Sequence, residues 1–439
     1  MKSYNKITRL LIAIVVIALP LLSSSYLSAN SNSLMDQQVS EYLSKKKGEQ
    51  VLLLKQLVNI NSGTLNIDGV INVGKLLEPE FQAAGFSTHW VDLPAYMQRA
   101  GTLVAERKGS SGKKLLLIGH LDTVFPKDSP FQKFTRTGKF ATGPGVIDNK
   151  GGIVVILYAL KALQSINALK NTDITIVLTG DEENNGKPVT ISRQHLISMA
   201  KSADIVLDFE PTVSGSASVG RRGTTHWLIE ASGHEGHSSI IFSDQVGAGA
   251  TFELARILDE LRRTMNDEQG LTINPSTVVA GVKASYDKDT GIGNVFGRTN
   301  LIAKTAIARG DIRYISEKQR HRLITKMTKI TQKSLPGTKT NLQLEQVLPP
   351  MPTTQDSLNL FESYSIISKR LGYGEIALLP AELRGGGDIS YVAPYVSTAL
   401  VGIGASGEGE HSPLEKVDID SLFIRSQLAA LLILELTGP

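Results

Sequence analysis

The chain has 439 residues, of which 41% are hydrophobic and 20% are charged, a composition typical of a globular protein rather than a disordered one. The length provides material for two or three domains, and the absence of cysteine excludes disulfides and a lipidated N-terminal cysteine. The formal net charge is +4, and no basic stripe interleaved with aromatic residues occurs, so no nucleic-acid partner is expected.

The first 29 residues have the three-part pattern of a secretory signal peptide. Lys2, Lys6 and Arg9 precede an apolar run over residues 10–22, and small residues follow up to position 29. The apolar run is short for a membrane span and contains Pro20. We therefore expect an exported protein, periplasmic or secreted, without a membrane attachment after signal cleavage. An uncleaved N-terminal anchor is the alternative.

Short apolar runs then alternate with helix-like stretches. Strands are predicted at residues 114–122, 173–183, 203–212 and 397–405, and a helix is predicted at 151–166. This alternation favours an α/β fold, with a mostly parallel sheet covered by helices on both faces.

The middle of the chain follows another pattern. The order of predicted elements is β-α-β-β-α-β, ending with a strand at 340–348, and Ser316 is the expected N-cap of its second helix. This order is typical of a ferredoxin-like α+β unit. We place that inserted domain at residues 220–337, between a first catalytic part at 30–219 and a second at 338–439.

Histidines and acids follow several of the predicted strands. The positions are His120 and Asp122, Asp148 in a Gly-rich turn, Asp181, Glu182 and Glu183, Glu210, and His411. Ligands of open α/β sheets bind at the carboxyl ends of the strands, so these side chains should converge there. Crowded acids repel each other unless cations compensate them.

Two histidines with several carboxylates and no thiolate form a ligand set that suits zinc, and less specifically cobalt or manganese. Many acids shared among few histidines indicate two metal ions bridged by one carboxylate. Asp148 fits the bridge, and Asp122 is placed to orient the imidazole of His120.

The segments HLDTV, GPGVIDNKGG, DEE, FEPT and a late GxGxH together resemble the motifs of the M20 metallopeptidases, in the same order. The resemblance implies a zinc-exopeptidase-like α/β/α catalytic domain with an inserted domain for dimerisation or as a lid. It also implies that His120, Asp148 and Glu210 bind one Zn²⁺, that Asp148, Glu183 and His411 bind another, and that Glu182 is the general base. The peptide bond after Asp148 is expected to be cis. The FEPT form resembles the glutamate carboxypeptidase type.

The inserted domain and the late Gly-rich segment offer candidate substrate contacts. By resemblance, His237 polarises the scissile carbonyl, often across a dimer, with His234 as a weaker candidate. Asn300 and Arg313 resemble residues that bind the substrate carbonyl and carboxylate, a role suited to a guanidinium. In RGGGDISY, the backbone at Gly385, Gly386 and Gly387 could approach the substrate. Ala303 and Gly387 depart from the family pattern, in segments that bear on specificity.

The leading interpretation is an exported dizinc carboxypeptidase, possibly of glutamate type, that acts on a small peptide or an N-acyl amino acid and forms a homodimer. An N-acyl-amino-acid deacylase or dipeptidase on the same site is the alternative. A non-enzymatic binding protein of this fold is a more distant one, because every expected ligand is present. The roles of Asp181 and Glu415 stay open at this point.

Overall fold

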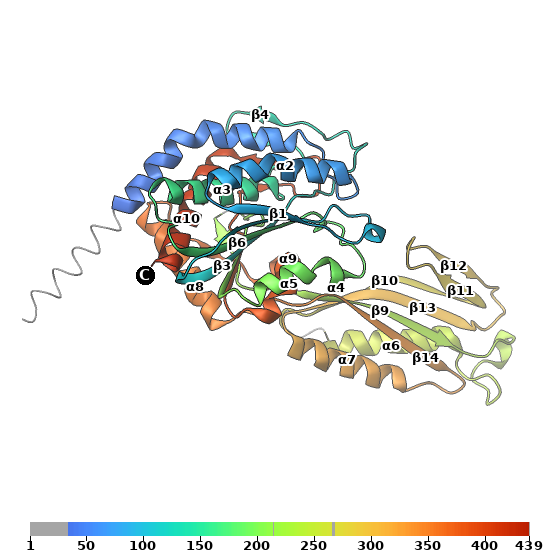
Figure 1. Cartoon of the computed structure of the whole chain (residues 1–439). Helices are drawn as coiled ribbons and strands as arrows, with labels where there is room; N and C mark the ends of the chain where they lie inside the picture. Colours follow the sequence, from blue (N-terminus) through green and yellow to red (C-terminus); the bar gives the residue numbers. More distant parts are fainter. Residues whose placement is uncertain (1–33, 214, 266–267, 439) are drawn as a thin grey trace, which may run out of the picture.

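The computed structural model describes residues 34–213, 215–265 and 268–438, which form two units (Figure 1). The larger one, the main unit, contains a six-stranded sheet in the order β1-β2-β6-β3-β7-β16. Its strands are β1 (Ser87–Val91), β2 (Thr102–Arg107), β6 (Thr172–Thr179), β3 (Ser111–His120), β7 (Ile205–Asp208) and β16 (Ala399–Val401). The last four are mutually parallel, whereas β1 and β2 add an antiparallel edge. The predicted strands exist, but each ends before the acids that follow it.

Helices cover both faces of this sheet. Alternate residues of β3 divide between two cores, with Leu115 and Leu117 in one and Leu116 and Ile118 in the other. The first core packs against a helix over residues 34–58 and against α2 (Ile67–Ala83), α3 (Lys150–Ser165), α8 (Gln355–Arg370) and α10 (Ile419–Thr437). The second packs against α5 (Gln194–Ala200) and α9 (Asp388–Val392). This confirms the α/β/α layering expected from near-continuous apolar strands.

The inserted unit has an antiparallel sheet in the order β10-β13-β9-β14. Its elements are β9 (Gly223–Ser232), α6 (Gly249–Met265), β10 (Thr272–Gly281), β13 (Thr305–Tyr314), α7 (Glu317–Gln332) and β14 (Lys339–Leu348). Both helices pack on one face of the sheet, and the arrangement is the predicted ferredoxin-like one (Figure 1). Ser316 caps α7, accepting a hydrogen bond from the Gln319 backbone N–H at 3.2 Å.

Two features of the inserted unit differ from the sequence prediction. The predicted boundary at residue 337 excludes β14, yet β14 pairs with β9 along its whole length, from Lys339 opposite Ser232 onward. The unit therefore continues through Leu348, because its sheet needs the fourth strand. A hairpin of β11 (Lys283–Tyr286) and β12 (Gly293–Phe296), inserted between β10 and β13, was not predicted.

Smaller elements complete the main unit. A second sheet has the order β17-β18-β5-β4, and its strands are β17 (Gly407–Glu408), β18 (Lys416–Asp418), β5 (Phe140–Thr142) and β4 (Thr135–Thr137). The others are α4 (Val189–Ser192), the strand pair β8 (Ser216–Ala217) and β15 (Ala377–Leu378), and the 3-10 turns η1 (Ala95–Met97), η2 (Ser238–Ile240, in the inserted unit), η3 (Ala381–Leu383) and η4 (Ala393–Tyr395).

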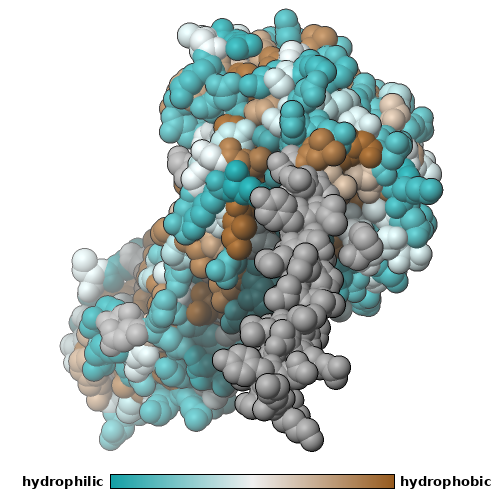
Figure 2. Space-filling model, turned by 90° about the vertical axis from the view of Figure 1, so that its left-hand side faces the viewer, coloured by the Kyte–Doolittle hydropathy of each residue, from teal (hydrophilic) through white to brown (hydrophobic). Residues whose placement is uncertain are grey.

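In the space-filling view the two units form two lobes whose visible surfaces are mostly hydrophilic (Figure 2). Among the described residues, no helix has the length and apolar character to cross a membrane. The predicted signal peptide at residues 1–29 lies outside the described part of the chain.

Candidate metal centre

The carboxyl ends of three neighbouring parallel strands bring the candidate ligands together. His120 is the last residue of β3, Glu182 and Glu183 follow β6, and Glu210 follows β7. Two loops complete the group, because Asp148 lies just before α3 and His411 lies between β17 and β18. Residues scattered over almost 300 positions of the sequence thus meet at one sheet edge, as the sequence predicted.

Asp148 lies between the two histidines and offers one carboxylate oxygen to each. Its Oδ1 is 3.0 Å from His120 Nε2, and its Oδ2 is 3.1 Å from His411 Nε2. His120 Nε2 is also 3.4 Å from Glu210 Oε1, and His411 Nε2 is 3.2 Å from Glu183 Oε2. Three groups that could each hold a metal ion result, with potential ligand atoms within 4.8 Å of one another. Two of them share Asp148, His120–Asp148–Glu210 and Asp148–Glu183–His411, and the third, His120–Glu182–Glu183, includes the candidate base. The peptide bond between Asp148 and Asn149 is cis.

Asp122 links His120 to the loop that carries the two glutamates. Its carboxylate accepts hydrogen bonds from the backbone N–H groups of Glu182 and Glu183, both at 3.1 Å, and from the Thr64 hydroxyl at 2.6 Å. Its Oδ1 also lies 3.3 Å from His120 Nδ1. Asp122 therefore orients the imidazole, and it also holds the backbone from which Glu182 projects.

Burial and the crowding of charged groups shift several pKa values at this sheet edge. Burial raises the pKa of Glu183 to about 7. Burial raises the pKa of Glu182 well above its ordinary value, and the charge of Glu210 acts in the same direction. Hydrogen bonds that the His411 imidazole donates to the carboxylates of Asp148 and Glu183 raise its pKa to about 11. A metal ion bound here would replace the proton on His411 as the positive charge beside these carboxylates.

The donor set fits a metal ion. Within the described residues, Glu183 Oε1 is buried without a hydrogen-bond partner, although such atoms are normally paired. Imidazole nitrogens and carboxylate oxygens are the ligands of zinc and similar divalent ions, and no thiolate competes. One metal ion in each of the two groups that share Asp148 would compensate the crowded acids.

Asp181 points away from the cluster and belongs to a buried ion network. Arg193, with 0% exposure, donates from Nε to Asp388 Oδ1 at 2.6 Å and from Nη2 to the backbone carbonyl of Asp181 at 3.0 Å. Its Nη1 also pairs with the Asp181 carboxylate, and Thr179 donates to Asp388 Oδ2 at 2.6 Å. The first acid of the DEE motif therefore anchors the loop rather than binding metal.

Glu415 supports the turn that carries Asp148. Its carboxylate, 0% exposed, accepts the backbone N–H groups of Gly145, Ile147 and Asp148 at 3.0, 3.0 and 3.2 Å. Burial lowers the pKa of the neighbouring Lys150 to about 7, against the opposing charge of Glu415. The late HSPLE segment thus supplies both a candidate ligand, His411, and a support for the shared carboxylate.

The Gly-rich segment lies beside the candidate base. A Cβ on Gly387 would lie 3.3 Å from Glu182 Oε1, so the missing side chain leaves room for that carboxylate.

A residue that the sequence analysis did not single out, Arg221, is 2% exposed and donates to the Gly385 carbonyl at 3.0 Å. Its Nη2 is 4.0 Å from Glu210 Oε2. The pair Arg221-Arg222, which follows the FEPT segment in the sequence, was the signal that could have pointed to this residue. Gly386 packs against Leu348, where a Cβ would lie 2.5 Å from Leu348 Cδ1.

The candidate substrate contacts of the inserted unit are not part of this cluster. His237 is exposed, and its Nδ1 lies 2.8 Å from the Ser239 hydroxyl. Asn300 is also exposed, and its carbonyl accepts the Ser238 N–H at 2.9 Å, so the loops of His237 and Asn300 lie side by side. Arg313 pairs with Asp311 at 3.0 Å within β13. Two of these three candidate contacts, His237 and Asn300, thus lie close to each other, but none of the three contacts the candidate metal ligands.

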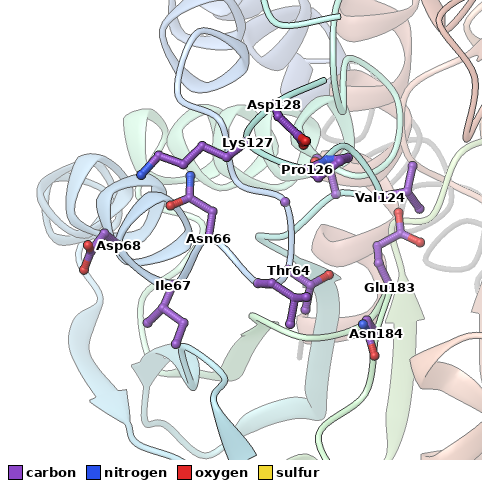
Figure 3. A pocket seen from close by; sticks show the side chains of 13 residues that line it. Thr64, Asn66, Ile67, Asp68, Val124, Pro126, Lys127, Asp128, Glu183 and Asn184 are labelled. Atoms are coloured by element: carbon purple, nitrogen blue, oxygen red, sulfur yellow. The ribbon is translucent and has the colours of Figure 1, made fainter. Parts of the chain in front are cut away.

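A cavity of about 860 Å³ opens beside the cluster. Glu183 and Asn184 line one side of it, and Asn66, Ile67 and Asp68 line the other (Figure 3). One cavity wall is therefore shared with a candidate metal ligand, so a molecule in this space could reach the cluster.

The sequence of the chain matches those of known peptidases and related hydrolases. The model of peptidase family M20/M25/M40 matches residues 116–435. The chain is 32% identical over 393 residues to carboxypeptidase G2 of Pseudomonas sp. (strain RS-16), covering 87% of this chain and 88% of that protein. It is 26% identical over 301 residues to succinyl-diaminopimelate desuccinylase of Sphingopyxis alaskensis, covering 66% of this chain and 74% of the relative.

Among solved structures, aminopeptidase PepT from Bacillus cereus superposes with a TM-score of 0.71 at 15% identity, covering 89% of this chain and 98% of the other. At that identity the likeness concerns the fold alone. It includes both units, since almost the whole of either chain is covered.

Proposed function

The chain belongs to peptidase family M20/M25/M40 and is an enzyme of this metallopeptidase type, and we propose that it is an exported carboxypeptidase with two zinc ions per chain. The observation that carries the two-ion proposal is the carboxylate of Asp148, which offers one oxygen to each of two histidines at 3.0 and 3.1 Å. His120 and Glu210 would complete one site, and Glu183 and His411 the other. Cobalt or manganese could replace zinc, because the donor set contains only nitrogen and oxygen.

The residues of the chain divide the work of amide hydrolysis. A bound metal ion would polarise the scissile carbonyl and lower the pKa of a water molecule. Glu182 accepts the proton of that water and returns it to the departing amine. This carboxylate lies beside the candidate ligands, outside both groups that share Asp148, and burial raises its pKa, which makes it a stronger proton acceptor than an ordinary glutamate. Asp122 keeps it in place through the Glu182 N–H.

We assign substrate recognition to residues of both units. Arg313 and Asn300 would bind the terminal carboxylate, and His237 would stabilise the developing oxyanion, in a homodimer formed through the inserted unit. Because these side chains do not contact the cluster, the proposal requires closure of the inserted unit or a partner subunit. Gly387, next to Glu182, would let the substrate backbone approach.

The preferred substrate is proposed to be a peptide or N-acyl amino acid with a C-terminal, glutamate-like residue. The likeness to a carboxypeptidase over 87% of the chain supports cleavage at the C-terminal residue, and the FEPT form is the basis for the glutamate-like preference. The second candidate is an N-acyl-amino-acid deacylase acting at the same site, which the likeness to a desuccinylase favours.

A substrate panel tests the function. The purified protein, with Zn²⁺ added, is assayed on dipeptides and N-acetyl amino acids that end in Glu, Ala, Leu or Lys, with released amino acid as the readout. Hydrolysis of dipeptides with a preference for C-terminal Glu is expected. Hydrolysis of N-acyl amino acids alone would favour the deacylase. No release from any member, by protein shown to contain metal, would contradict both.

A further inference from the structure

A second cavity, of about 650 Å³, lies between the two units and is called here the inter-unit cavity. The main unit lines it with Lys187, Tyr391 and Tyr395, and the inserted unit lines it with Lys288, Arg309 and Glu345. Glu183 and Asn184 line this cavity as well as the cavity of Figure 3. A molecule bound at the metal centre can therefore extend into the inter-unit cavity.

The inserted unit turns the helix-free face of its sheet toward this cavity. Along β13, Ala308 and Ile312 belong to the core beneath α6 and α7. Side chains alternate between the two faces of a strand, so Arg309, Asp311 and Arg313 lie on the opposite, helix-free face. That face meets the main unit at α4 and η4, whose Val189 and Tyr395 also line the cavity.

The cavity contains cationic groups that are not neutralised. Among the described residues, Lys187, Lys288 and Arg309 form no salt bridge, whereas the nearby Arg313 pairs with Asp311 and Arg193 pairs with Asp181 and Asp388. Lys288 donates to Gln343 Oε1 at 2.9 Å, and the Arg309 guanidinium lies 5.6 Å from the Tyr286 ring centroid. These neutral contacts orient both cations without cancelling their charge.

Other charged groups in the lining change this balance little. Glu345 is the acid that the inserted unit contributes, and it lies in register with His226 on the neighbouring strand. Burial and the positive charge of Arg309 lower the pKa of His226, so this imidazole is neutral near pH 7. Two lysines and one arginine thus face one acid, apart from Glu183 at the metal centre.

We propose that the inter-unit cavity is a binding site for an anionic group, a second carboxylate of the substrate whose scissile amide lies at the metal centre. The inference rests on the proposed hydrolysis at that centre and adds a specificity site to it. A guanidinium and two ammonium groups attract a carboxylate, and the guanidinium of the half-buried Arg309 can bind it through two hydrogen bonds. The carboxylate could belong to the acyl group or to the side chain of the released residue.

Matched substrates test the proposal and separate those two sources. N-acetyl-alanine is compared with N-succinyl-alanine, which adds a carboxylate to the acyl group, and with N-acetyl-glutamate, which adds one to the amino acid. The ratio of kcat/KM within each pair is measured for the native enzyme and for Arg309→Gln and Lys288→Gln. Lys283→Gln is the matched control, because Lys283 lies on the same hairpin and does not line the cavity.

We expect at least one pair to favour the additional carboxylate by tenfold or more. Arg309→Gln should lower that ratio at least tenfold, Lys288→Gln should lower it less, and Lys283→Gln should leave it unchanged. Native enzyme that shows no preference in either pair would overturn the proposal. So would variants that lose activity equally on the neutral and the charged member, because that loss would be a general structural effect.

A binding measurement keeps the test independent of turnover. The Zn²⁺-loaded Glu182→Gln protein is titrated by calorimetry with the same three compounds, and the charged compound should bind at least tenfold more tightly unless Arg309 is also changed. If the native enzyme hydrolyses none of the compounds but the Glu182→Gln protein keeps this binding preference, only the proposed function is contradicted. Hydrolysis without a binding preference would contradict the anionic site alone.

Discussion

In the main unit, the motif residues at the sheet edge are buried and bonded to one another, whereas those of the inserted unit are exposed and apart from them. His120 is 1% exposed and contacts three carboxylates, while His237 is exposed and its Nδ1 lies beside the Ser239 hydroxyl. The difference follows from the elements that carry them. The carboxyl ends of parallel strands lie at the same edge of one sheet, so the residues that follow them meet there. The loops of His237 and Asn300 are attached to β9 and β13, which belong to the other sheet. The candidate metal ligands are therefore assembled within the main unit, whereas the candidate substrate contacts lie on the inserted unit, apart from them.

Replacing a histidine at the sheet edge should have the largest effect. His120→Ala removes one ligand and leaves Asp148 and Glu210 without their shared partner, so metal binding at that group should be lost and activity should fall to background. Metal analysis of the purified variant measures this. In the native enzyme, a chelator should abolish activity and added Zn²⁺ should restore it. A native metal content in the variant would contradict the ligand assignment.

Glu182→Gln should separate catalysis from metal binding. Loss of a general base lowers kcat by about 10²–10⁴-fold, while the metal content should stay at the native level because Glu182 is outside both groups that share Asp148. Steady-state kinetics and metal analysis on the same preparation provide the measurement. Loss of metal together with activity would show that Glu182 is a ligand.

The buried ion network of the main unit should matter more for stability than an exposed ion pair of the inserted unit. Arg193→Met leaves Asp181 and Asp388 buried without their cation, which costs about 3–5 kcal/mol. Arg262→Met is the matched control, because Arg262 is 68% exposed and its pair with Asp259 on α6 contributes about 0–1 kcal/mol. Urea unfolding of both variants measures the contrast. Similar losses of unfolding free energy in the two would refute it.

His237→Ala tests whether the exposed histidine of the inserted unit reaches the reaction. If it stabilises the oxyanion, kcat should fall by about 10²–10³-fold. Metal content and the free energy of unfolding should stay unchanged, since the side chain is exposed. His234→Ala is the control and should be close to native in kcat. Native kcat in His237→Ala would show that the inserted unit contributes no such group.

The smallest effects are expected from matched helix caps in the two units. Thr354 caps α8 of the main unit by accepting the Ser357 N–H at 3.1 Å, and Ser316 caps α7 of the inserted unit. Each change to Ala should lower stability by about 1 kcal/mol. If the units unfold together, both variants shift one urea transition. Two transitions, each shifted by one variant only, would show that the units unfold separately.

The sequence determined the α/β/α layering, the ferredoxin-like order of the inserted unit and the convergence of the candidate ligands. Apolar periodicity and motif order are local properties, and the carboxyl ends of parallel strands must share an edge. The comparisons confirm the family. Zinc, the number of ions, the export signal and the roles of individual residues stay predictions.

Only the tertiary structure decided contacts between residues far apart in the chain. The sequence left the roles of Asp181 and Glu415 open. In the structure Asp181 is bound by Arg193, and Glu415 accepts hydrogen bonds from the turn at Asp148. The spacing of these residues in the sequence does not reveal either contact. The boundary at 337 was wrong because it left out the strand at 340–348, which the predicted order of the unit already included and which pairs with β9 as β14. The unpaired cations of the inter-unit cavity come from elements about a hundred residues apart, so their juxtaposition depends on how the two units pack.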